Sequence, residues 1–290
     1  MKYIAKRDIK VPNRSSRSHK GDNGKVLVIG GSRDYVGAVA LAGMAALRSG
    51  VDWVTIAAPE KVGYAINALS SDLVVKKYKG DDFCVSRAKD ILKFSKGFDS
   101  VLIGNGIGMN CKSFVRKYVK DATKNLVIDA DAIKHISLDN VSDCILTPHL
   151  RELEILLDNS LSGKPIIVKS IKKEKNIEKI SSLVKKILND KKLRNKKIVI
   201  LLKGKVDAII SKDKIKYNKT GNAGMTKAGT GDVLAGLCLG FVGQGVSLFQ
   251  SASNAAYYNG LAGDILLKKK KGFTYLASDL VEEIRGILRE

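Results

Sequence analysis

One segment in the last quarter of the chain combines small residues with a carboxylate in an order that suits phosphate chemistry. It runs from Gly221 to Asp232 and leads directly into the apolar stretch that begins at Val233. Successive small residues let backbone amides converge on an anion, and the helix that follows adds its positive amino end. Asp232 would repel a phosphate, but it suits a hydroxyl group whose proton it removes. The segment predicts phosphoryl transfer, with Asp232 as base and Gly229 and Gly231 neutralising charge.

A plainer interpretation of the same segment stays open, in which Asp232 caps the helix and the glycines only form a turn. The segment is not a Walker phosphate loop, because no Gly-Lys-Ser/Thr closes it. Similarly, the run Gly104–Gly108 lacks the GxGxxG spacing of a dinucleotide fingerprint. It follows an apolar run, and its glycines would let a ligand approach the backbone. The alternative is that the run forms only a tight turn.

Further polar residues follow apolar runs, where α/β enzymes place their ligand contacts. His149 comes after Pro148, and Lys203 ends the run Ile198–Leu202. His149 is expected to contact a ligand or to be an ordinary surface residue. Asp129 and Asp131 are expected either to hold Mg²⁺ through water or to organise their loop.

The elements that must position these residues begin with a strand, turn and helix near the N-terminus. Lys25–Ile29 is a short apolar run that enters the turn Gly30–Ser32, and the Ala-rich stretch 37–49 ends at Gly50. This pattern is typical of a buried strand followed by a helix with a glycine just past its end. The small residues of the helix predict close packing on a sheet. Trp53–Ala57 then completes a βαβ unit and implies parallel pairing.

The rest of the chain continues this alternation. Further strands are expected at 100–103, 125–128, 144–146, 165–168 and 198–202, with a small antiparallel hairpin at 208–210 and 215–217. Helices follow from Val233, from a capping box of Ser247 with Gln250, and from Ser278 as a cap to Leu288. The pattern predicts one doubly wound α/β domain, with mostly parallel central strands and helices on both faces.

Composition limits the class of protein. The chain has 290 residues, of which 44% are hydrophobic, so a sizeable core can form. The four cysteines lie far apart without a CxxC pair, which favours neither a zinc site nor a disulfide framework. The first 25 residues are polar and basic, and the apolar run 233–242 is too short to span a membrane. These features predict a soluble, cytoplasmic protein that does not bind membranes.

The formal net charge of +22 is unusual and raises the possibility of nucleic-acid binding. The 40 lysines are nevertheless spread along the chain, and few aromatic residues lie among them. The densest basic stretch, Ile171–Lys197, has the pattern of an amphipathic helix with one solvated face. The charge is therefore better explained by a lysine-rich surface, which also favours polyanionic small molecules such as nucleotides.

Taken together, the motifs resemble the NAD(P)H-hydrate dehydratase family of the ribokinase-like superfamily. The resemblance extends from about Arg17 to the C-terminus. The motifs that carry it are Ser18-His19-Lys20-Gly21-Asp22, Gly30-Gly31-Ser32, Tyr35-Val36-Gly37-Ala38, Ile128-Asp129-Ala130-Asp131-Ala132, Leu146-Thr147-Pro148-His149, Leu202-Lys203-Gly204 and the glycine segment before Val233. It implies a ribokinase-like fold, with residues 1–16 as an N-terminal extension and residues 17–290 as a single dehydratase domain.

The resemblance implies a metabolite-repair lyase that restores NADH or NADPH from its hydrate. Enzymes of this family phosphorylate the hydroxyl at the expense of ADP or ATP, with Mg²⁺, and then eliminate phosphate. ADP is the expected donor, and a homotetramer is the expected assembly. The epimerase domain of the larger bifunctional members is expected to be absent, because only about 16 residues precede Arg17.

The resemblance also implies a set of site residues. Those expected to bind the hydrated dinucleotide are Ala38, Gly106, His149 and Asp232. Those expected to bind the nucleotide are Lys203, Gly204, Lys205, Val206, Asp207, Thr230 and Gly231. The metal ligands are left open.

Two departures from the family pattern bear on activity. Ala228 stands where the family usually has the first of two glycines, and His149-Leu150-Arg151-Glu152 replaces His-Pro-Gly-Glu. A positive φ at Ala228 would be strained and would reduce activity, whereas ordinary backbone there would be harmless. Two other functions remain as alternatives: a ribokinase-superfamily kinase of a vitamin precursor or sugar, and a nucleic-acid-binding protein.

Overall fold

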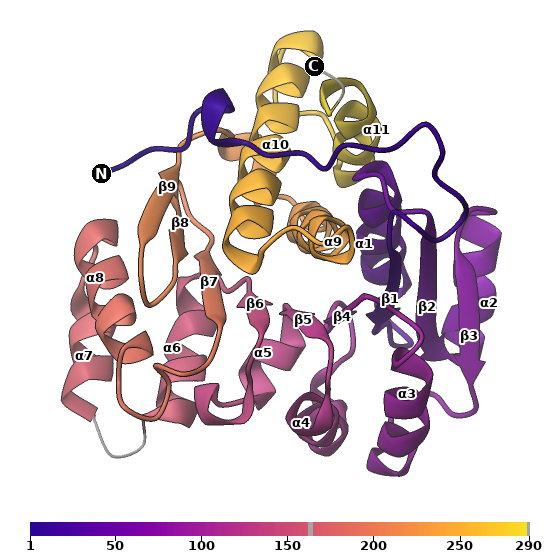
Figure 1. Ribbon diagram of the computed structural model, residues 1–290, viewed down its shortest axis with the longest axis horizontal. Helices are drawn as coiled ribbons and strands as arrows, with labels where there is room; N and C mark the ends of the chain where they lie inside the picture. Colours follow the sequence, from indigo (N-terminus) through magenta and orange to yellow (C-terminus); the bar gives the residue numbers. More distant parts are fainter. Residues whose placement is uncertain (162–164, 289–290) are drawn as a thin grey trace.

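The computed structural model describes residues 1–161 and 165–288, arranged around one nine-stranded sheet (Figure 1). The strand order is β3-β2-β1-β4-β5-β6-β7-β8-β9. Strands β1 to β7 are parallel, and β8 and β9 add an antiparallel edge. The strands are β1 (Lys25–Ile29), β2 (Trp53–Pro59), β3 (Val74–Tyr78), β4 (Ser100–Ile103), β5 (Asn125–Ile128), β6 (Cys144–Leu146), β7 (Ile198–Leu202), β8 (Asp207–Ile210) and β9 (Ile215–Asn218).

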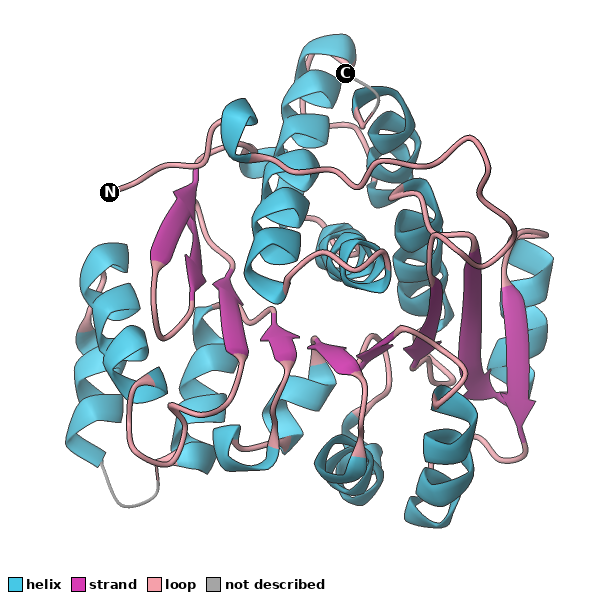
Figure 2. Ribbon diagram, in the orientation of Figure 1, coloured by secondary structure: helices cyan, strands magenta, loops and turns pink. Residues whose placement is uncertain are grey.

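Helices cover both faces of the sheet, as expected, so the central strands are buried on two sides (Figure 2). In β1, Val26 and Val28 join one hydrophobic core, while Leu27 and Ile29 join the other. This division follows from the alternation of side chains along a strand.

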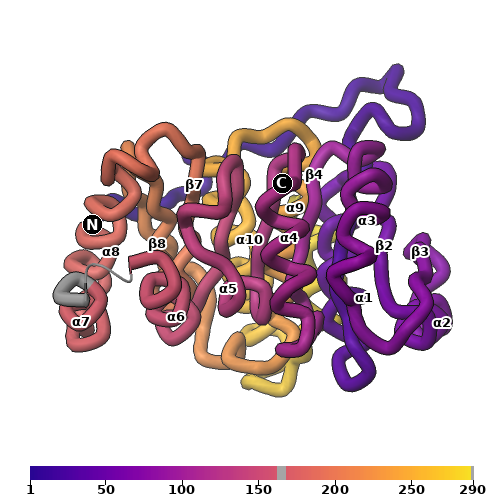
Figure 3. Tube along the Cα trace, turned by 90° about the horizontal axis from the view of Figure 1, so that it is seen from below, coloured from indigo at the N-terminus to yellow at the C-terminus, as the bar shows by residue number. Residues whose placement is uncertain are grey.

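The two helix layers come from different parts of the chain. The layer on the face of Val26 consists of α1 (Val36–Arg48), α2 (Glu60–Leu69), α9 (Thr230–Gly243), α10 (Leu248–Lys269) and α11 (Ala277–Ile287). The opposite layer, seen in Figure 3, consists of α3 (Ala88–Ser95), α4 (Lys112–Asp121), α5 (Asp131–His135), α6 (Leu150–Ser160), α7 (Pro165–Lys173) and α8 (Ile177–Leu188). All the C-terminal helices therefore return to the face that holds α1.

The small residues of α1 serve a helix–helix contact as well as the sheet. A Cβ atom added at Gly236 of α9 would collide with the carbonyl oxygen of Ala42, and one at Gly240 would collide with the Ser49 hydroxyl. The backbones of α1 and α9 therefore approach closely. The Oγ of Ser100, at the start of β4, also donates to the carbonyl oxygen of Leu239 at 3.1 Å. These contacts fix the position of α9, whose first turn carries Asp232.

Two predictions in the Lys-rich region were wrong in detail. The strand expected at Pro165–Val168 is instead the first part of α7. A run of four apolar residues does not distinguish strand from helix, and proline is favoured in the first turn of a helix. The helix expected over Ile171–Lys197 is divided between α7 and α8, because the Asn176 side chain accepts the amides of Glu178 and Lys179 and starts a new helix.

The ends of the last two helices also differ from expectation. Ser247 does precede α10, but its side chain makes no capping hydrogen bond, and Gln250 instead donates to the carbonyl oxygen of Asp8 at 2.8 Å. Ser278 lies inside α11, which begins one residue earlier. Instead of Ser278, the Asp279 carboxylate caps the start of α11, where it accepts the amide of Leu276 at 2.8 Å.

The N-terminal segment lies across β9 and α10 (Figure 1). Tyr3 forms an isolated parallel bridge with Tyr217, and Ile4 is buried. The side chain of Asn254 in α10 pairs with the backbone of Lys10. Among the described residues, no helix has the length and apolar character needed to cross a membrane.

Candidate active site

The amino end of α9 has the geometry expected of an anion-binding site. Gly229 precedes the helix in a left-handed conformation, with φ of +93°. Gly229 has no side chain with which to cap the helix. The amide of Thr230 donates to the carbonyl oxygen of Lys227 at 3.4 Å, whereas the amides of Gly231 and Asp232 lie within the first turn, where the helix dipole favours negative charge.

Asp232 lies in this first turn and is held by a neighbouring amide. Nδ2 of Asn105, which follows β4, lies 2.6 Å from Oδ1 of Asp232. The same nitrogen lies 2.9 Å from Oδ2 of Asp129, which follows β5. Side chains from the ends of two parallel strands thus meet the mouth of α9.

Lys203 supplies positive charge to the same site. Its Nζ is 3.1 Å from Oδ1 of Asp129 and 3.9 Å from Oε2 of Glu152. A Cβ atom added at Gly231 would lie 3.5 Å from this ammonium group. The cation is therefore next to the first turn of α9, where it could pair with a phosphate.

The electrostatic setting suits a general base. Burial, reinforced by the charge of Asp129, raises the pKa of Asp232 to about 7, although the Asn105 hydrogen bond and Lys203 oppose the shift. Burial works to lower the pKa of Lys203, but Asp129, Glu152 and Asp232 outweigh it and keep that pKa above its ordinary value. Asp232 can therefore exchange a proton near neutral pH, while Lys203 stays charged.

His149 and Glu152 form a reciprocal cap at the start of α6. The Glu152 carboxylate accepts the amide of His149 at 2.9 Å, and Nδ1 of His149 accepts the amide of Glu152 at 3.2 Å. The two residues that depart from the family pattern, Leu150 and Arg151, lie between them and do not disturb this cap. A parallel backbone bridge between His149 and Lys203 places the start of α6 beside Lys203.

The backbone at Ala228 is ordinary. The non-glycine residues with positive φ in the described part of the chain are Ala130, Asp143 and Lys271, and Ala228 is not among them. The left-handed conformation falls on Gly229 instead. The departure at Ala228 therefore imposes no left-handed strain.

This assignment predicts the effect of Ala228→Gly. We expect unchanged turnover and nucleotide affinity, with unfolding free energy lowered by up to about 1 kcal/mol, because glycine gains freedom in the unfolded chain. Turnover and thermal unfolding measured together test this. An increase in turnover would mean that the methyl group obstructs the site.

Ala38 and Gly106 lie together on the side of the site nearest β1. A Cβ atom at Gly106 would be 3.3 Å from the Cβ of Ala38 and 2.7 Å from that of Tyr35. Gly106 has φ of +61°, so both conformation and space require glycine. A pocket of about 380 Å³ adjoins the first turn of α1, and Arg33 and Lys61 are among its lining residues.

The residues expected to bind the nucleotide divide into two groups. Lys203, Gly231 and the exposed Gly204 and Lys205 lie open to the site or to solvent. The others have partners within the fold: Asp207 accepts the amide of Gly204 at 3.0 Å, Thr230 donates to the carbonyl oxygens of Met225 and Lys227, and Val206 packs against the core. Burial raises the pKa of Asp207 to about 6.

The acidic residues after β5 are engaged by protein partners. Thr147 donates to Asp129 at 2.6 Å, in addition to Lys203 and Asn105, while Lys134 and the amide of Gly108 donate to Asp131. Within residues 1–161 and 165–288, no group of three or more metal-binding side chains could hold a metal. The sequence left two roles open for Asp129 and Asp131, holding Mg²⁺ through water and organising the loop, and these contacts favour the second.

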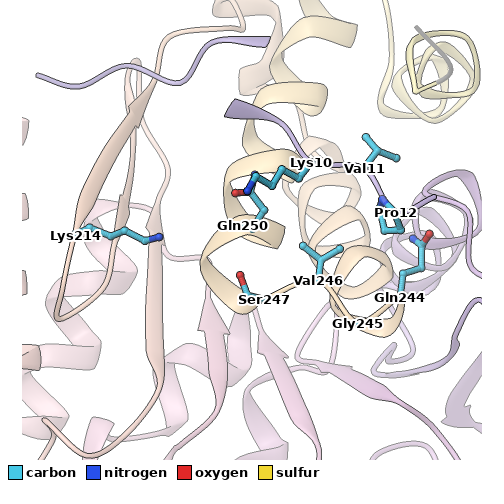
Figure 4. A pocket seen from close by; sticks show the side chains of 9 residues that line it. All are labelled: Lys10, Val11, Pro12, Lys214, Gln244, Gly245, Val246, Ser247 and Gln250. Atoms are coloured by element: carbon cyan, nitrogen blue, oxygen red, sulfur yellow. The ribbon is translucent and has the colours of Figure 1, made fainter. Parts of the chain in front are cut away.

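A separate pocket of about 490 Å³ lies at the opposite end of α9 (Figure 4). It is lined by Lys10, Val11, Pro12, Lys214, Gln244, Gly245, Val246, Ser247 and Gln250. None of the expected site residues contributes to it.

The sequence analysis assigned no site role to Asn105, Thr147 or Glu152. Asn105 and Thr147 are fully buried, and Glu152 is nearly so. The available signals were a polar residue between two glycines and a threonine directly after an apolar strand. A polar side chain at such a position can be buried only where it has a hydrogen-bond partner. The sequence does not show which residue is that partner, whereas the fold does.

Comparisons with known proteins show which family this chain is similar to. A sequence profile described as NAD(P)H-hydrate dehydratase matches residues 26–285. The chain is 38% identical to a bifunctional NAD(P)H-hydrate repair enzyme of Methanothermobacter thermautotrophicus, over 97% of this chain and 52% of that one. It is 33% identical to the ADP-dependent (S)-NAD(P)H-hydrate dehydratase of Cenarchaeum symbiosum, over 96% and 93%.

Solved structures extend the comparison to the fold. The ADP/ATP-dependent NAD(P)H-hydrate dehydratase of Bacillus subtilis, co-crystallized with ATP and Mg²⁺, has a TM-score of 0.75 and 25% identity, over 96% of this chain and 93% of that one. Arabidopsis thaliana ribokinase, with a TM-score of 0.56 and 13% identity over 92% and 99%, shares the fold alone. The chain spans about half the length of the bifunctional relatives it matches. It belongs to the NAD(P)H-hydrate dehydratase family, in a ribokinase-like fold.

Proposed function

We propose that this protein is an ADP-dependent NAD(P)H-hydrate dehydratase, a lyase that returns hydrated NADH or NADPH to the reduced cofactor. The observation that carries the proposal is the position of Asp232, at the mouth of a helix with uncapped amides and next to the ammonium group of Lys203. A carboxylate among anion-binding groups suits a reaction in which a hydroxyl is phosphorylated.

Each part of the reaction can be assigned to a residue. Asp232 takes the proton of the substrate hydroxyl, whose oxygen then bonds to the terminal phosphorus of ADP as the bond to AMP breaks. The amides at Gly229 to Gly231, with Lys203, neutralise the phosphoryl group in transit. The carbon–oxygen bond of the phosphate ester then breaks and inorganic phosphate leaves with the electron pair. The neighbouring ring carbon gives its proton to water, and the ring double bond is restored.

The hydrated dinucleotide would occupy the side of the site formed by Ala38, Gly106 and His149. The nucleotide would lie toward Lys203, Gly204 and Lys205, with its phosphates at Thr230 and Gly231. Val206 and Asp207 support this region from within, since the Asp207 carboxylate holds the turn at Gly204.

Mg²⁺ would enter with the nucleotide. The residues around Asp232 supply no protein cage for a metal, and Mg²⁺ commonly keeps several waters and binds through substrate phosphates. There it supplies charge neutralisation for the phosphates. Its removal by a chelator would therefore weaken nucleotide affinity without unfolding the protein.

A direct assay tests the proposed function. The protein is incubated with hydrated NADH, Mg²⁺ and either ADP or ATP, and the near-ultraviolet absorbance of NADH is followed. Return of that absorbance with release of AMP and phosphate supports an ADP-dependent dehydratase. A phosphorylated hydrate that accumulates without return of absorbance would identify a kinase instead. No reaction with either nucleotide would contradict the dehydratase and would leave a kinase of a vitamin precursor or sugar as the alternative.

The position of the nucleotide can be predicted separately. In an ADP titration followed by backbone amide NMR, we expect the largest changes at Gly229 to Asp232 and at Lys203 and Gly204, because the phosphates should meet the amides of α9. The pocket of Figure 4 serves as the internal control and should not respond. Changes centred on Gly30–Ser32 would place the phosphates at the first glycine turn and contradict this arrangement.

The homotetramer and the cytoplasmic location remain predictions. Light scattering of the purified protein would test the first, with a mass near four times 31.4 kDa expected. Fractionation of the source cells would test the second.

A further inference from the structure

Asn105 is held rigidly at the centre of the site. It lies between Gly104 and Gly106, whose φ values of +125° and +61° turn the chain sharply after β4. Its carbonyl oxygen accepts the amide of Gly31 at 2.9 Å. A Cβ atom at Gly30 would collide with that same oxygen, so the first glycine turn of the chain closes directly onto Asn105.

The side chain of Asn105 is matched to two carboxylates. Its Nδ2 group has two hydrogens, and Asp232 and Asp129 each accept one, at 2.6 and 2.9 Å. Because an ionised carboxylate only accepts hydrogen bonds, the amide nitrogen must face the pair. The amide oxygen is then left buried without a hydrogen-bond partner, which costs stability. Asn105 thus satisfies both carboxylates while its own amide oxygen has no hydrogen-bond partner.

The surroundings of Asp232 explain what this contact contributes. The charged groups that face Asp232 are Asp129, from the end of β5, and Lys203, from the end of β7. Burial and Asp129 favour the protonated carboxyl, whereas Asn105 and Lys203 favour the ionised form. Lys203 is shared with Asp129 and Glu152. Asn105 is the neutral donor that bonds directly to Asp232.

We propose that Asn105 is a positioning residue for Asp232: its buried amide fixes the carboxylate at the mouth of α9 and stabilises the ionised form that accepts the substrate proton. This inference rests on the proposed function for the identity of the reaction, but the contact itself can be tested without turnover. It also gives the turn Gly30–Ser32 a role, since close approach of that turn holds the backbone of Asn105.

The test is a direct titration of Asp232 in the ligand-free protein. The carboxyl carbon of Asp232 is followed by ¹³C NMR and assigned by the loss of its signal in Asp232→Asn. Asn105→Leu removes the donor while keeping most of the volume, and Asn105→Ala is the second variant. We expect the titration midpoint of Asp232 to rise by about one pH unit in both, because a hydrogen bond to the charged form is lost.

Ser100→Ala is the matched control. Ser100 lies at the other end of β4, is fully buried and bonds to the same helix, α9, through Leu239. Its replacement should lower the melting temperature and leave the midpoint of Asp232 in place. An unchanged midpoint in the Asn105 variants, an equal rise in Ser100→Ala, or failure of both Asn105 variants to fold would overturn the proposal.

Kinetics distinguish this proposal from the proposed function. With hydrated NADH and ADP, the Asn105 variants should show kcat reduced about 10-fold at neutral pH and partly recovered at higher pH, with little change in KM for ADP. Loss that does not recover with pH would indicate general damage and contradict positioning. A wild-type protein without turnover, whose Asp232 midpoint still responds to Asn105, would reject the dehydratase and retain the positioning contact.

Discussion

Asp232→Asn is expected to lower turnover by roughly 100-fold or more while nucleotide binding and the fold are retained. The amide is nearly isosteric with the carboxylate but cannot accept the substrate proton, and general-base catalysis commonly contributes at least this factor. Initial rates with hydrated NADH and ADP measure the loss, and calorimetric titration with ADP measures binding. Turnover close to that of the wild type would exclude Asp232 as the base, and loss of ADP binding would assign it a structural role.

The pH dependence of the wild-type enzyme provides a second view of the same residue. Since burial raises the pKa of Asp232 to about 7, and the base acts in its ionised form, kcat/KM should rise as the pH increases through that value. Asp232→Asn should abolish this acidic limb in its residual activity. A limb centred near the ordinary pKa of an aspartate would mean that Asp232 is better solvated than its position indicates.

Gly229→Ala is expected to produce the other large effect, on stability and nucleotide binding together. Gly229 has φ of +93°, and a Cβ atom there would lie 2.8 Å from both Leu41 Cδ1 and Ala277 Cβ. Left-handed strain and overpacking together should lower the unfolding free energy by about 2–4 kcal/mol. Relief of the clash would move the first turn of α9, so ADP affinity should fall at least 10-fold. Denaturant unfolding and ADP titration measure the two effects.

Gly245→Ala is the matched control for this prediction. Gly245 lies just beyond the other end of α9 with φ of +82°, and nothing lies within 4 Å of an added Cβ atom. It should show the left-handed penalty of about 1–2 kcal/mol without a change in ADP affinity. Equal losses of stability in the two variants would show that the contacts with Leu41 and Ala277 are readily accommodated. Unchanged ADP affinity in Gly229→Ala would argue against phosphate binding at α9.

The sequence determined most of the central sheet and the small-residue helices. The apolar runs at β1, β4, β5, β6 and β7 and the hairpin of β8 and β9 are short and end at polar or glycine residues, so local patterns suffice to find them. At Pro165 the pattern failed, because four apolar residues fit either a strand or the first turn of a helix. Strand β3 was not predicted. Its apolar run, Val74 and Val75, is only two residues long, because Lys76 and Lys77 follow directly. As an edge strand, β3 can form with little apolar surface, so the local pattern does not reveal it.

The sequence also predicted the chemical character proposed for the site. Small residues before an apolar helix, with a carboxylate at its mouth, indicate anion binding and a base wherever that helix is placed. Whether Ala228 is strained could not be read locally, because the left-handed position could fall on either Ala228 or Gly229. The packing of Gly229 against Leu41 and Ala277, which leaves no room for a side chain, shows that it falls on Gly229.

Only the tertiary structure decided which polar residues act on Asp232. Asn105, Asp129 and Lys203 are separated by dozens of residues along the chain, and each follows a different strand. Parallel strands bring their carboxyl ends to one edge of the sheet, so three loops meet at the first turn of α9. The ionisation of Asp232 depends on burial and on charges within a few ångströms, and these distances exist only once the sheet has formed.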